Sequence, residues 1–410
     1  MKELLKIAYR GLGRNRRRTL LSALALGLGV ALLLMMAAFV EGEMRGSLEL
    51  GIRLESGHLQ VRARDYDSSK ASLAWEDLVQ SPDVIAAQVA KLAPVRAAAP
   101  RLYASGILLA GDESLGVRIV GLDPDSATTG IYREGLRGGA WLAADDREGV
   151  LIGEALAAKR NLNVGDRITL LVNTSNGDVD EQRFVIRGIY TTNTPSYDQS
   201  NILMPLAKAQ AISQAGNRAS LIWVMLDDMF QAEAVAAALT SSQYEVKTWE
   251  QLNEFVLSIE SYSGAMMAVF YLIVLGITAT VVVNAMVMAV FERTREIGVL
   301  AAIGMKGRRI MALFLIESFL LAVIGVAMGL VLGGIIVYWV STRGVYLGDL
   351  VADMGVTGLL MGDRIYGYLT AQDATMLVIA AFAVTMLASL YPAMLAAHME
   401  PVQALHGGEA

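Results

Sequence analysis

The residues of this sequence that could carry out chemistry are few, and their spacing favours no catalytic site. The chain has no cysteine, which excludes thiol catalysis, disulfides and thiolate metal sites. Its histidines are far apart in the sequence: His58, His398 and His406. Paired carboxylates such as Asp145-Asp146 and Asp227-Asp228 lie in polar stretches that are typical of solvated turns. We therefore expect no catalytic residue and no bound metal ion.

The sequence also lacks a motif for ATP hydrolysis. The P-loop pattern Gly-x-x-x-x-Gly-Lys-Ser/Thr does not occur, because Gly304-Met-Lys-Gly does not fit it. Neither a Gly-x-Ser-x-Gly elbow nor a His-Glu-x-x-His pair is present. We expect that this chain does not itself hydrolyse ATP, and a membrane-anchored enzyme is the function that we favour least.

Two polar residues lie inside long apolar stretches. Glu317 lies within residues 310–340, where a charge is costly unless it has a partner or access to water. A proton relay is one interpretation, but we favour an ion pair with Arg308 or Arg309, or with a neighbouring helix. We expect Asn284 to form a hydrogen bond between helices rather than to bind a ligand.

The most informative charged stretch is residues 291–305, between the apolar runs 264–290 and 310–340. Each run can cross a bilayer, which takes roughly 20 apolar helical residues. Glu292 and Glu296 are one helical turn apart, which predicts a short amphipathic helix. Basic residues place this helix in the cytoplasm by the positive-inside rule: Arg293, Arg295, Lys306, Arg308 and Arg309.

The surrounding elements are those of a membrane protein. A hydrophobic content of 54% excludes an ordinary soluble enzyme. We predict transmembrane helices at residues 20–41, 264–291, 310–340 and 374–396, with a cytoplasmic segment at 292–309 and an outer loop at 341–373. Residues 1–19 predict a basic amphipathic helix on the inner membrane face, and residues 397–410 a cytoplasmic tail. We favour a retained first span over a signal peptide, because the run is long and no cleavage site follows it.

Residues 42–263 contain no run long enough to span a membrane, and strand and helix patterns alternate there. They predict a large α+β extracytoplasmic domain between the first and second spans. If its first and last thirds pair, the middle, at about 125–215, is an inserted subdomain. Small residues at Gly325, Gly329 and Gly333 predict close helix packing in the third span.

Four sequence blocks in this layout resemble the MacB/FtsX-type permeases of ABC transporters. They are Arg17-Arg-Thr-Leu-Leu-Ser22, Ile152-Gly-Glu-Ala-Leu-Ala157 with Val164-Gly-Asp166, residues 284–304, and residues 391–405. Within the family, the length and the early Gly57-His-Leu-Gln-Val61 strand are most similar to the LolC/LolE lipoprotein-releasing permeases. The resemblance implies a protein of the inner (cytoplasmic) membrane that has four spans and a MacB-like periplasmic core domain.

The resemblance also implies partners. Members pair as two permeases, identical or paralogous, and bind two cytoplasmic ATPase subunits, which bind ATP and Mg, whereas this chain binds no cofactor. The segment between spans two and three is then the helix that couples to the ATPase, with these candidate residues: Glu292, Arg293, Arg295, Glu296, Ile297, Gly298, Leu300, Ala301, Ile303 and Gly304. An apolar ridge of Ile297, Leu300, Ala301 and Ile303 would enter a groove of the ATPase. The family often has Arg or Lys where Ala301 stands.

The implied function is extraction of a lipoprotein, or another lipidated or amphiphilic substrate, from the outer leaflet. Flexible side chains at the outer ends of two spans are candidates for substrate contact, with lipid-facing or core positions as the alternative: Met35, Met36, Phe39, Met266, Met267 and Phe270. An alternative function is mechanotransmission, either MacB-like export with a periplasmic adaptor or activation of a periplasmic partner. The resemblance does not assign carrier binding to this subunit, because residues 173–182 form a short polar hairpin where LolC-type proteins have a longer hook loop. Nothing in the charge pattern indicates nucleic acid, and the sequence fits a Gram-negative or a Gram-positive cell.

Overall fold

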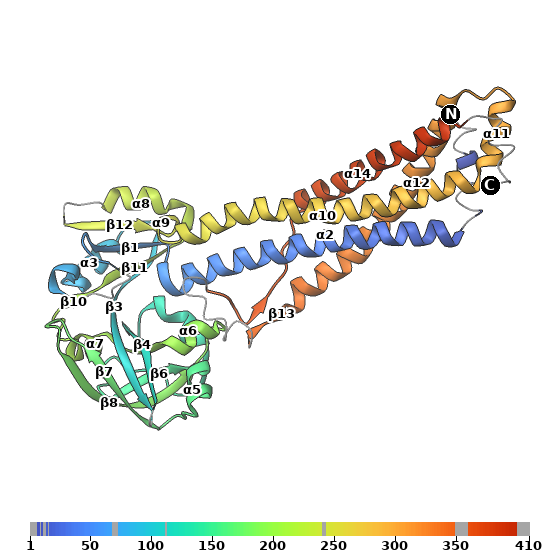
Figure 1. The fold of residues 1–410 in the computed structure, drawn as a ribbon. Helices are drawn as coiled ribbons and strands as arrows, with labels where there is room; N and C mark the ends of the chain where they lie inside the picture. Colours follow the sequence, from blue (N-terminus) through green and yellow to red (C-terminus); the bar gives the residue numbers. More distant parts are fainter. Residues whose placement is uncertain are drawn as a thin grey trace. The chain divides into compact units, whose positions relative to one another are not determined.

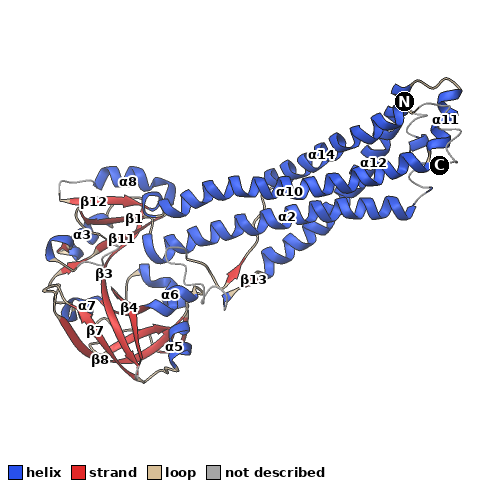
Figure 2. Cartoon of the chain, viewed as in Figure 1, coloured by secondary structure: helices blue, strands red, loops and turns tan. Residues whose placement is uncertain are grey.

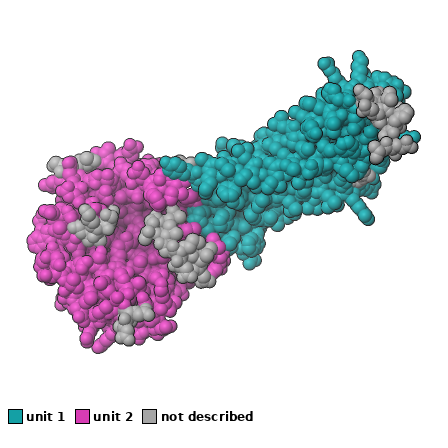
Figure 3. All heavy atoms as spheres, viewed as in Figure 1, with its two compact units in different colours: residues 1–43, 260–345, 365–410 teal, residues 44–259, 346–364 magenta. Residues whose placement is uncertain are grey.

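The computed structural model describes residues 6–8, 10, 14, 16–67, 73–110, 113–239, 243–348 and 360–399. The chain divides into two compact units (Figure 3). Unit 1 comprises residues 1–43, 260–345 and 365–410, and unit 2 comprises residues 44–259 and 346–364. The helix expected over 1–19 and the tail expected over 397–410 lie largely outside the described residues, as do residues 349–359 of the expected outer loop.

Unit 1 is built from long apolar helices. They are α2 (Arg16–Gly51), α10 (Glu254–Glu292), α12 (Gly307–Arg343) and α14 (Ala371–Ala397). Figure 1 labels them, and each is long and apolar enough to cross a membrane. Their buried apolar side chains pack in one cluster, to which α2 contributes Leu26 and Val30, α10 contributes Leu275, and α14 contributes Leu377. Within the described residues, the sequence therefore yields the four apolar helices that its hydropathy predicts.

Glycines bring α2 and α12 into close contact. A Cβ atom on Gly329 would lie 2.6 Å from the Cβ of Val30 and 2.8 Å from the carbonyl oxygen of Gly27. Gly325 and Gly333 face Leu26 and Leu34 of α2 in the same way. The stripe of small residues on α12 therefore lies against α2, where larger side chains would separate the two backbones.

Aromatic side chains are exposed near the C-terminal end of α12 and in the segment before α14. Tyr338 and Trp339 are 72% and 55% exposed, and Tyr366 and Tyr368 are exposed as well. The amide of Tyr368 donates to the carbonyl of Ala38 on α2 at 2.8 Å, which fixes this segment to the bundle. Such a group of exposed Tyr and Trp is typical of a membrane–water interface.

Unit 2 is organised around one mixed sheet (Figure 2). Its strands are β1 (Leu59–Ala63), β3 (Val95–Ala110), β4 (Glu113–Leu122), β5 (Leu136–Gly139), β6 (Gly149–Gly153), β7 (Arg167–Asn173), β8 (Val179–Tyr190), β9 (Asn201–Pro205), β11 (Leu221–Leu226) and β12 (Tyr244–Thr248). The order is β12-β1-β11-β3-β4-β9-β6-β8-β5, and β7 pairs with β3 and β8. Its helices are α3 (Pro82–Val89), α4 (Gly130–Glu134), α5 (Glu154–Arg160), α6 (Pro195–Ser200), α7 (Leu206–Ile212), α8 (Ala232–Leu239) and α9 (Trp249–Leu252). Two-residue strands are β2 (Val79–Gln80), β10 (Arg218–Ala219), β13 (Val345–Tyr346) and β14 (Arg364–Ile365).

The long strand β3 explains how the parts of unit 2 join. Residues 95–101 of β3 pair with β11, and residues 106–109 pair with β7. All of β4 pairs with residues 101–110 of β3. The first and last thirds of the domain do pair, because β1 lies between β11 and β12. Residues 125–215, where an inserted subdomain is expected, contain β5 to β9, which continue the same sheet through β3 and β4, and the subdomain stays a prediction.

Candidate functional site

The charged segment between the second and third apolar helices contains a short helix, α11 (Thr294–Ala302). Gly304 ends it with a φ of +91°, a conformation that favours glycine. The amide of Gly304 donates to the carbonyl of Ala301 and the amide of Met305 to that of Leu300, both at 3.0 Å. This pair of bonds is a Schellman motif, so Gly304 has a local structural role in addition to its suggested place in a docking surface.

The apolar ridge expected to enter an ATPase groove faces mainly the other way. Ile297 is 4% exposed and packs in a core with Val290 and Phe314, and Ala301 packs against the same core. Gly298 is buried, Leu300 is half-buried, and only Ile303 of the ridge is largely exposed, at 77%. The apolar face is therefore used to hold α11 on the bundle, because an amphipathic helix buries its apolar stripe against the nearest apolar surface.

Glu317 forms an ion pair, as expected, but its partner is Arg293 and not Arg308 or Arg309. Arg293 Nη1 donates to Glu317 Oε2 at 3.1 Å, and the two side chains are only 10% and 4% exposed. Arg308 and Arg309, the expected partners, are exposed. Arg293 lies at the break between α10 and α11 and is 9% exposed, so it is not a surface residue that a second protein could contact directly.

The two acidic candidates on the segment contact basic residues near the start of the chain. Arg14 Nη2 lies 2.6 Å from Glu296 Oε1, and Arg18 donates to Glu292. The Arg14–Glu296 pair is more than half exposed, whereas Arg18 and Glu292 are partly covered. The exposed residues of α11 and its C-terminal turn are Arg295, Glu296, Val299, Ala302, Ile303 and Gly304.

The candidates for substrate contact differ in exposure. Met266 and Phe270 on α10 are 59% and 43% exposed, while Met267 is 7% exposed. On α2, the candidates Met35, Met36 and Phe39 are all half-buried. Asn284, expected to bond between helices, is exposed on α10 of this single chain.

Sequence reasoning missed a cluster of charges where α2 ends in unit 2. A π-helical turn (Ile52–Ser56) follows α2, and Arg101 of β3 donates to the carbonyl of Leu54 at 3.2 Å and to that of Thr128 at 3.3 Å. The Arg101 guanidinium is fully buried and lies 4.1 Å from the ring centroid of Trp223. Arg118 of the neighbouring strand β4 donates to both carboxylate oxygens of Glu55. The signal that could have found this cluster is an arginine within an apolar alternating strand.

A second buried polar centre in unit 2 is Asp198 of α6. Its carboxylate accepts the Thr191 hydroxyl at 2.9 Å and both the amide and the hydroxyl of Thr192, the latter at 2.7 Å. Burial nevertheless raises the pKa of Asp198 to about 6, because the charged form is desolvated more than these bonds compensate.

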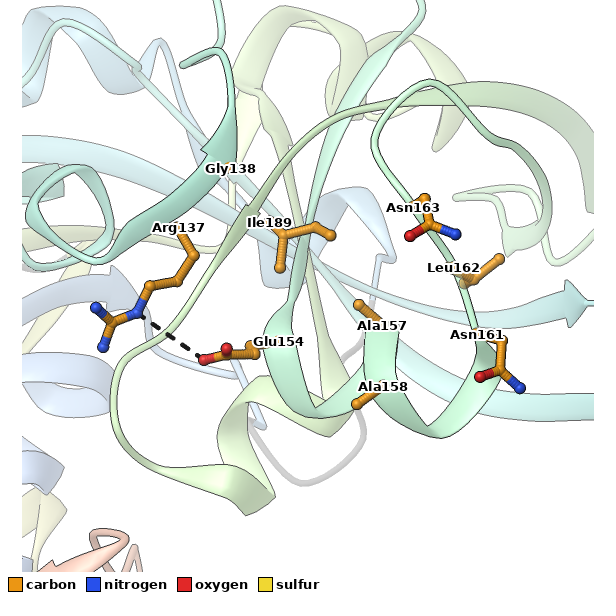
Figure 4. Close-up of a pocket in the computed structure, with 9 residues that line it drawn as sticks. All are labelled: Arg137, Gly138, Glu154, Ala157, Ala158, Asn161, Leu162, Asn163 and Ile189. Carbon is orange, nitrogen blue, oxygen red and sulfur yellow. Dashed lines mark ion pairs between the residues drawn. The ribbon is translucent and has the colours of Figure 1, made fainter.

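Two surface features of unit 2 bear on binding. The turn between β7 and β8 does not extend freely, because Ser175 Oγ donates to the Gln214 carbonyl and Asn176 Nδ2 to the Gln214 side chain, each at 2.7 Å. A groove of about 380 Å³ lies beside β5 and α5, with Ala157 and Ile189 among its apolar lining. Figure 4 shows it, including the 3.9 Å ion pair of Arg137 with Glu154.

Comparison with known proteins finds two families that match successive parts of the chain. The family described as MacB-like periplasmic core domain matches residues 19–242, and the family described as FtsX-like permease C-terminal matches residues 268–401. The lipoprotein-releasing system transmembrane protein LolC of Xylella fastidiosa (strain Temecula1) is 24% identical over 401 residues, covering 94% of this chain and 92% of the relative. The corresponding LolE of Haemophilus influenzae is 25% identical and covers 65% of this chain and 66% of the relative.

Among solved structures, the periplasmic region of MacB from Actinobacillus actinomycetemcomitans covers 51% of this chain and 97% of that chain, with 18% identity and a TM-score of 0.35. The first family match alone spans more than half of the sequence, and the second spans α11, α12, α14 and most of α10. The chain therefore belongs to the MacB/FtsX-type ABC transporter permeases and is similar to the LolC/LolE permeases within them.

Proposed function

We propose that this permease extracts a lipoprotein, or another lipidated or amphiphilic substrate, from the outer leaflet of the inner membrane. The observation that carries the proposal is the similarity to a LolC that covers 94% of this chain and 92% of the relative. A second permease, identical or paralogous, completes the transporter, and ATP is hydrolysed on separate ATPase subunits that bind ATP and Mg.

The energy of ATP enters at α11 in this proposal. The bundle end that holds α11 faces the cytoplasm together with both termini, and unit 2 lies in the periplasm. The ATPase contacts the exposed side of α11, mainly Arg295, Val299 and Ile303, while Ile297 anchors the helix to the bundle. An exposed apolar residue flanked by charges is suited to a groove on a partner protein.

The substrate contacts the outer ends of α2 and α10. Met266 and Phe270 offer exposed apolar surface, and thioether side chains adapt to acyl chains of different length. The short, fixed turn between β7 and β8 supports a role in which any periplasmic carrier binds the second permease rather than this one.

Reconstitution tests the function directly. The permease with its co-purifying ATPase is placed in proteoliposomes that contain a triacylated lipoprotein, and release into the soluble fraction is measured with ATP and with ATP plus vanadate. ATP-dependent, vanadate-sensitive release supports the proposal. ATP-dependent change in the binding of a soluble partner without release contradicts it and favours mechanotransmission.

A matched pair of variants tests the docking surface. Ile303→Asp places a charge on the exposed tip of α11 and should reduce co-purification of the ATPase by roughly tenfold or more, as expected for loss of a buried apolar anchor. Val179→Asp, at a position that is 61% exposed in unit 2, is the control and should have no effect. Equal ATPase recovery from both variants would contradict docking at Ile303.

A further inference from the structure

Ion pairs connect the junction between α10 and α11 with α12 and α2. Arg293, at the N-terminus of α11, pairs with Glu317 of α12, and Glu292, the last residue of α10, pairs with Arg18 of α2. The Arg14–Glu296 pair lies further out and is more than half exposed. The pairs therefore differ in their degree of burial, and the most buried one joins α11 to α12.

Burial makes the Arg293–Glu317 pair unlike an ordinary surface ion pair. Charges that are shielded from water interact more strongly, and removal of one partner leaves the other charge buried. The pair also lies next to the apolar core that holds Ile297 and Phe314, so polar and apolar contacts fix the same end of α11. By contrast, an exposed pair is screened by water and salt and holds its helices weakly.

The packing of α12 extends this connection. Glu317 is eight residues before Gly325, where the close contact with Leu26 of α2 begins, and the contact continues through Gly329. Because glycine lets the two backbones pack in direct contact, a shift of α12 meets α2 with no intervening side chain. A displacement of Arg293 is thus passed to α12 by the ion pair and from α12 to α2 by the glycine stripe.

We propose that Arg293 and Glu317 are a positioning pair that transmits the movement of α11 to α12 and α2, so that ATP hydrolysis on the partner drives substrate release. The inference rests on the proposed function, and it assigns to Glu317 a mechanical role in place of proton transfer. The pair contacts neither ATP nor substrate, so its loss should separate ATP hydrolysis from release.

The main test is Glu317→Gln in the reconstituted complex. ATPase co-purification and hydrolysis should stay within about twofold of wild type, while lipoprotein released per ATP should fall by roughly fivefold or more, as for loss of a coupling free energy. The double variant Arg293→Glu with Glu317→Arg restores a pair of opposite charges and should recover release. Glu49→Gln, which removes an exposed pair between α2 and Arg53 of the following π-helical turn, is the matched control and should leave release unchanged. Unchanged release per ATP in Glu317→Gln overturns the proposal.

A second readout does not depend on substrate. Because the chain has no cysteine, Ala302→Cys and Leu21→Cys give two specific spin-label sites, both at exposed positions and neither among the proposed ATPase contacts. The distance distribution, measured in nanodiscs with labelled chain diluted by unlabelled chain, should be narrow in the parent and broad after Glu317→Gln. Equal widths overturn the positioning role. If the wild-type complex, without cysteines or labels, releases no lipoprotein at all, the proposed function fails. The spin-label distance measurement then decides the role of the Arg293–Glu317 pair by itself.

Discussion

Two buried polar side chains determine much of the local chemistry of unit 2. Asp198 is 2% exposed and Arg101 is fully buried, yet no side chain of opposite charge is recorded within hydrogen-bonding distance of either among the described residues. Hydroxyl and amide groups solvate Asp198, and two carbonyls and an indole ring contact Arg101. The stability of the fold therefore depends on the contacts of each buried charge, and each residue gives a testable prediction.

The raised pKa of Asp198 predicts a pH-dependent stability. Between the unfolded pKa, near 3.8, and the folded pKa of about 6, the folded state binds more protons, so stability is highest below this window and falls as the pH rises through it. The shift corresponds to about 3 kcal/mol in total. Chemical unfolding of the full chain in detergent, followed by tryptophan fluorescence from pH 4 to 7, should show this slope. Asp198→Asn cannot ionise and should lose it; the same slope in both proteins would contradict the assignment.

Arg101 should be among the most sensitive positions of the domain. Arg101→Met removes the donors to the carbonyls of Leu54 and Thr128 and leaves both acceptors buried, which should cost about 2–4 kcal/mol. Arg96→Met on the same strand is the control, because Arg96 is exposed and its loss should change stability by less than about 0.5 kcal/mol. The free energy of unfolding of both variants is measured under identical conditions, and similar losses would show that burial of Arg101 is unimportant.

At the scale of elements, the contact between α2 and α12 depends on the absence of side chains. Gly329 meets Val30 and the backbone of Gly27, whereas a Cβ on Gly334, five residues later, would have no neighbour within 4 Å. The two glycines lie on the same helix but face different surroundings. Comparing the same substitution at both positions therefore separates the effect of packing from that of helix propensity.

Gly329→Ala and Gly334→Ala should therefore have opposite effects. The first forces α2 and α12 apart and should destabilise the bundle by about 1–3 kcal/mol. The second adds no contact and should be neutral or stabilising by up to about 1 kcal/mol, because alanine favours a helix. Thermal unfolding in nanodiscs measures both. A loss of stability in Gly334→Ala equal to that in Gly329→Ala would refute the contact.

Helix α11 shows how an element can be anticipated while its orientation is not. The charged segment predicted a short amphipathic helix, and a helix is present at Thr294–Ala302. However, its apolar face packs on the bundle, and the exposed residues belong to the opposite side. Docking residues are therefore better chosen from exposure than from hydrophobicity.

At the scale of the molecule, the topology makes a prediction that cysteine labelling can check. Phe230 in unit 2 and Ile303 after α11 are both 77% exposed, so burial does not distinguish them. In intact cells with a permeabilised outer envelope, a membrane-impermeant maleimide should label Phe230→Cys, and should label Ile303→Cys only after the inner membrane is opened. Labelling of Ile303→Cys from outside would reverse the orientation that the basic residues predict.

Hydropathy and residue periodicity are local properties, so the four apolar helices, the α+β character of the intervening domain and the charged segment could be predicted from the sequence. The family could be predicted too, since its motifs occur in order along the chain. The pairing of Glu317 with Arg293, the inward facing of Ile297 and the contacts of Arg101 and Arg118 with the residues just after α2 became visible in the folded structure. These are contacts between residues far apart in the sequence or on opposite faces of one helix. Partner choice and facing depend on how helices and strands pack, which no local pattern specifies.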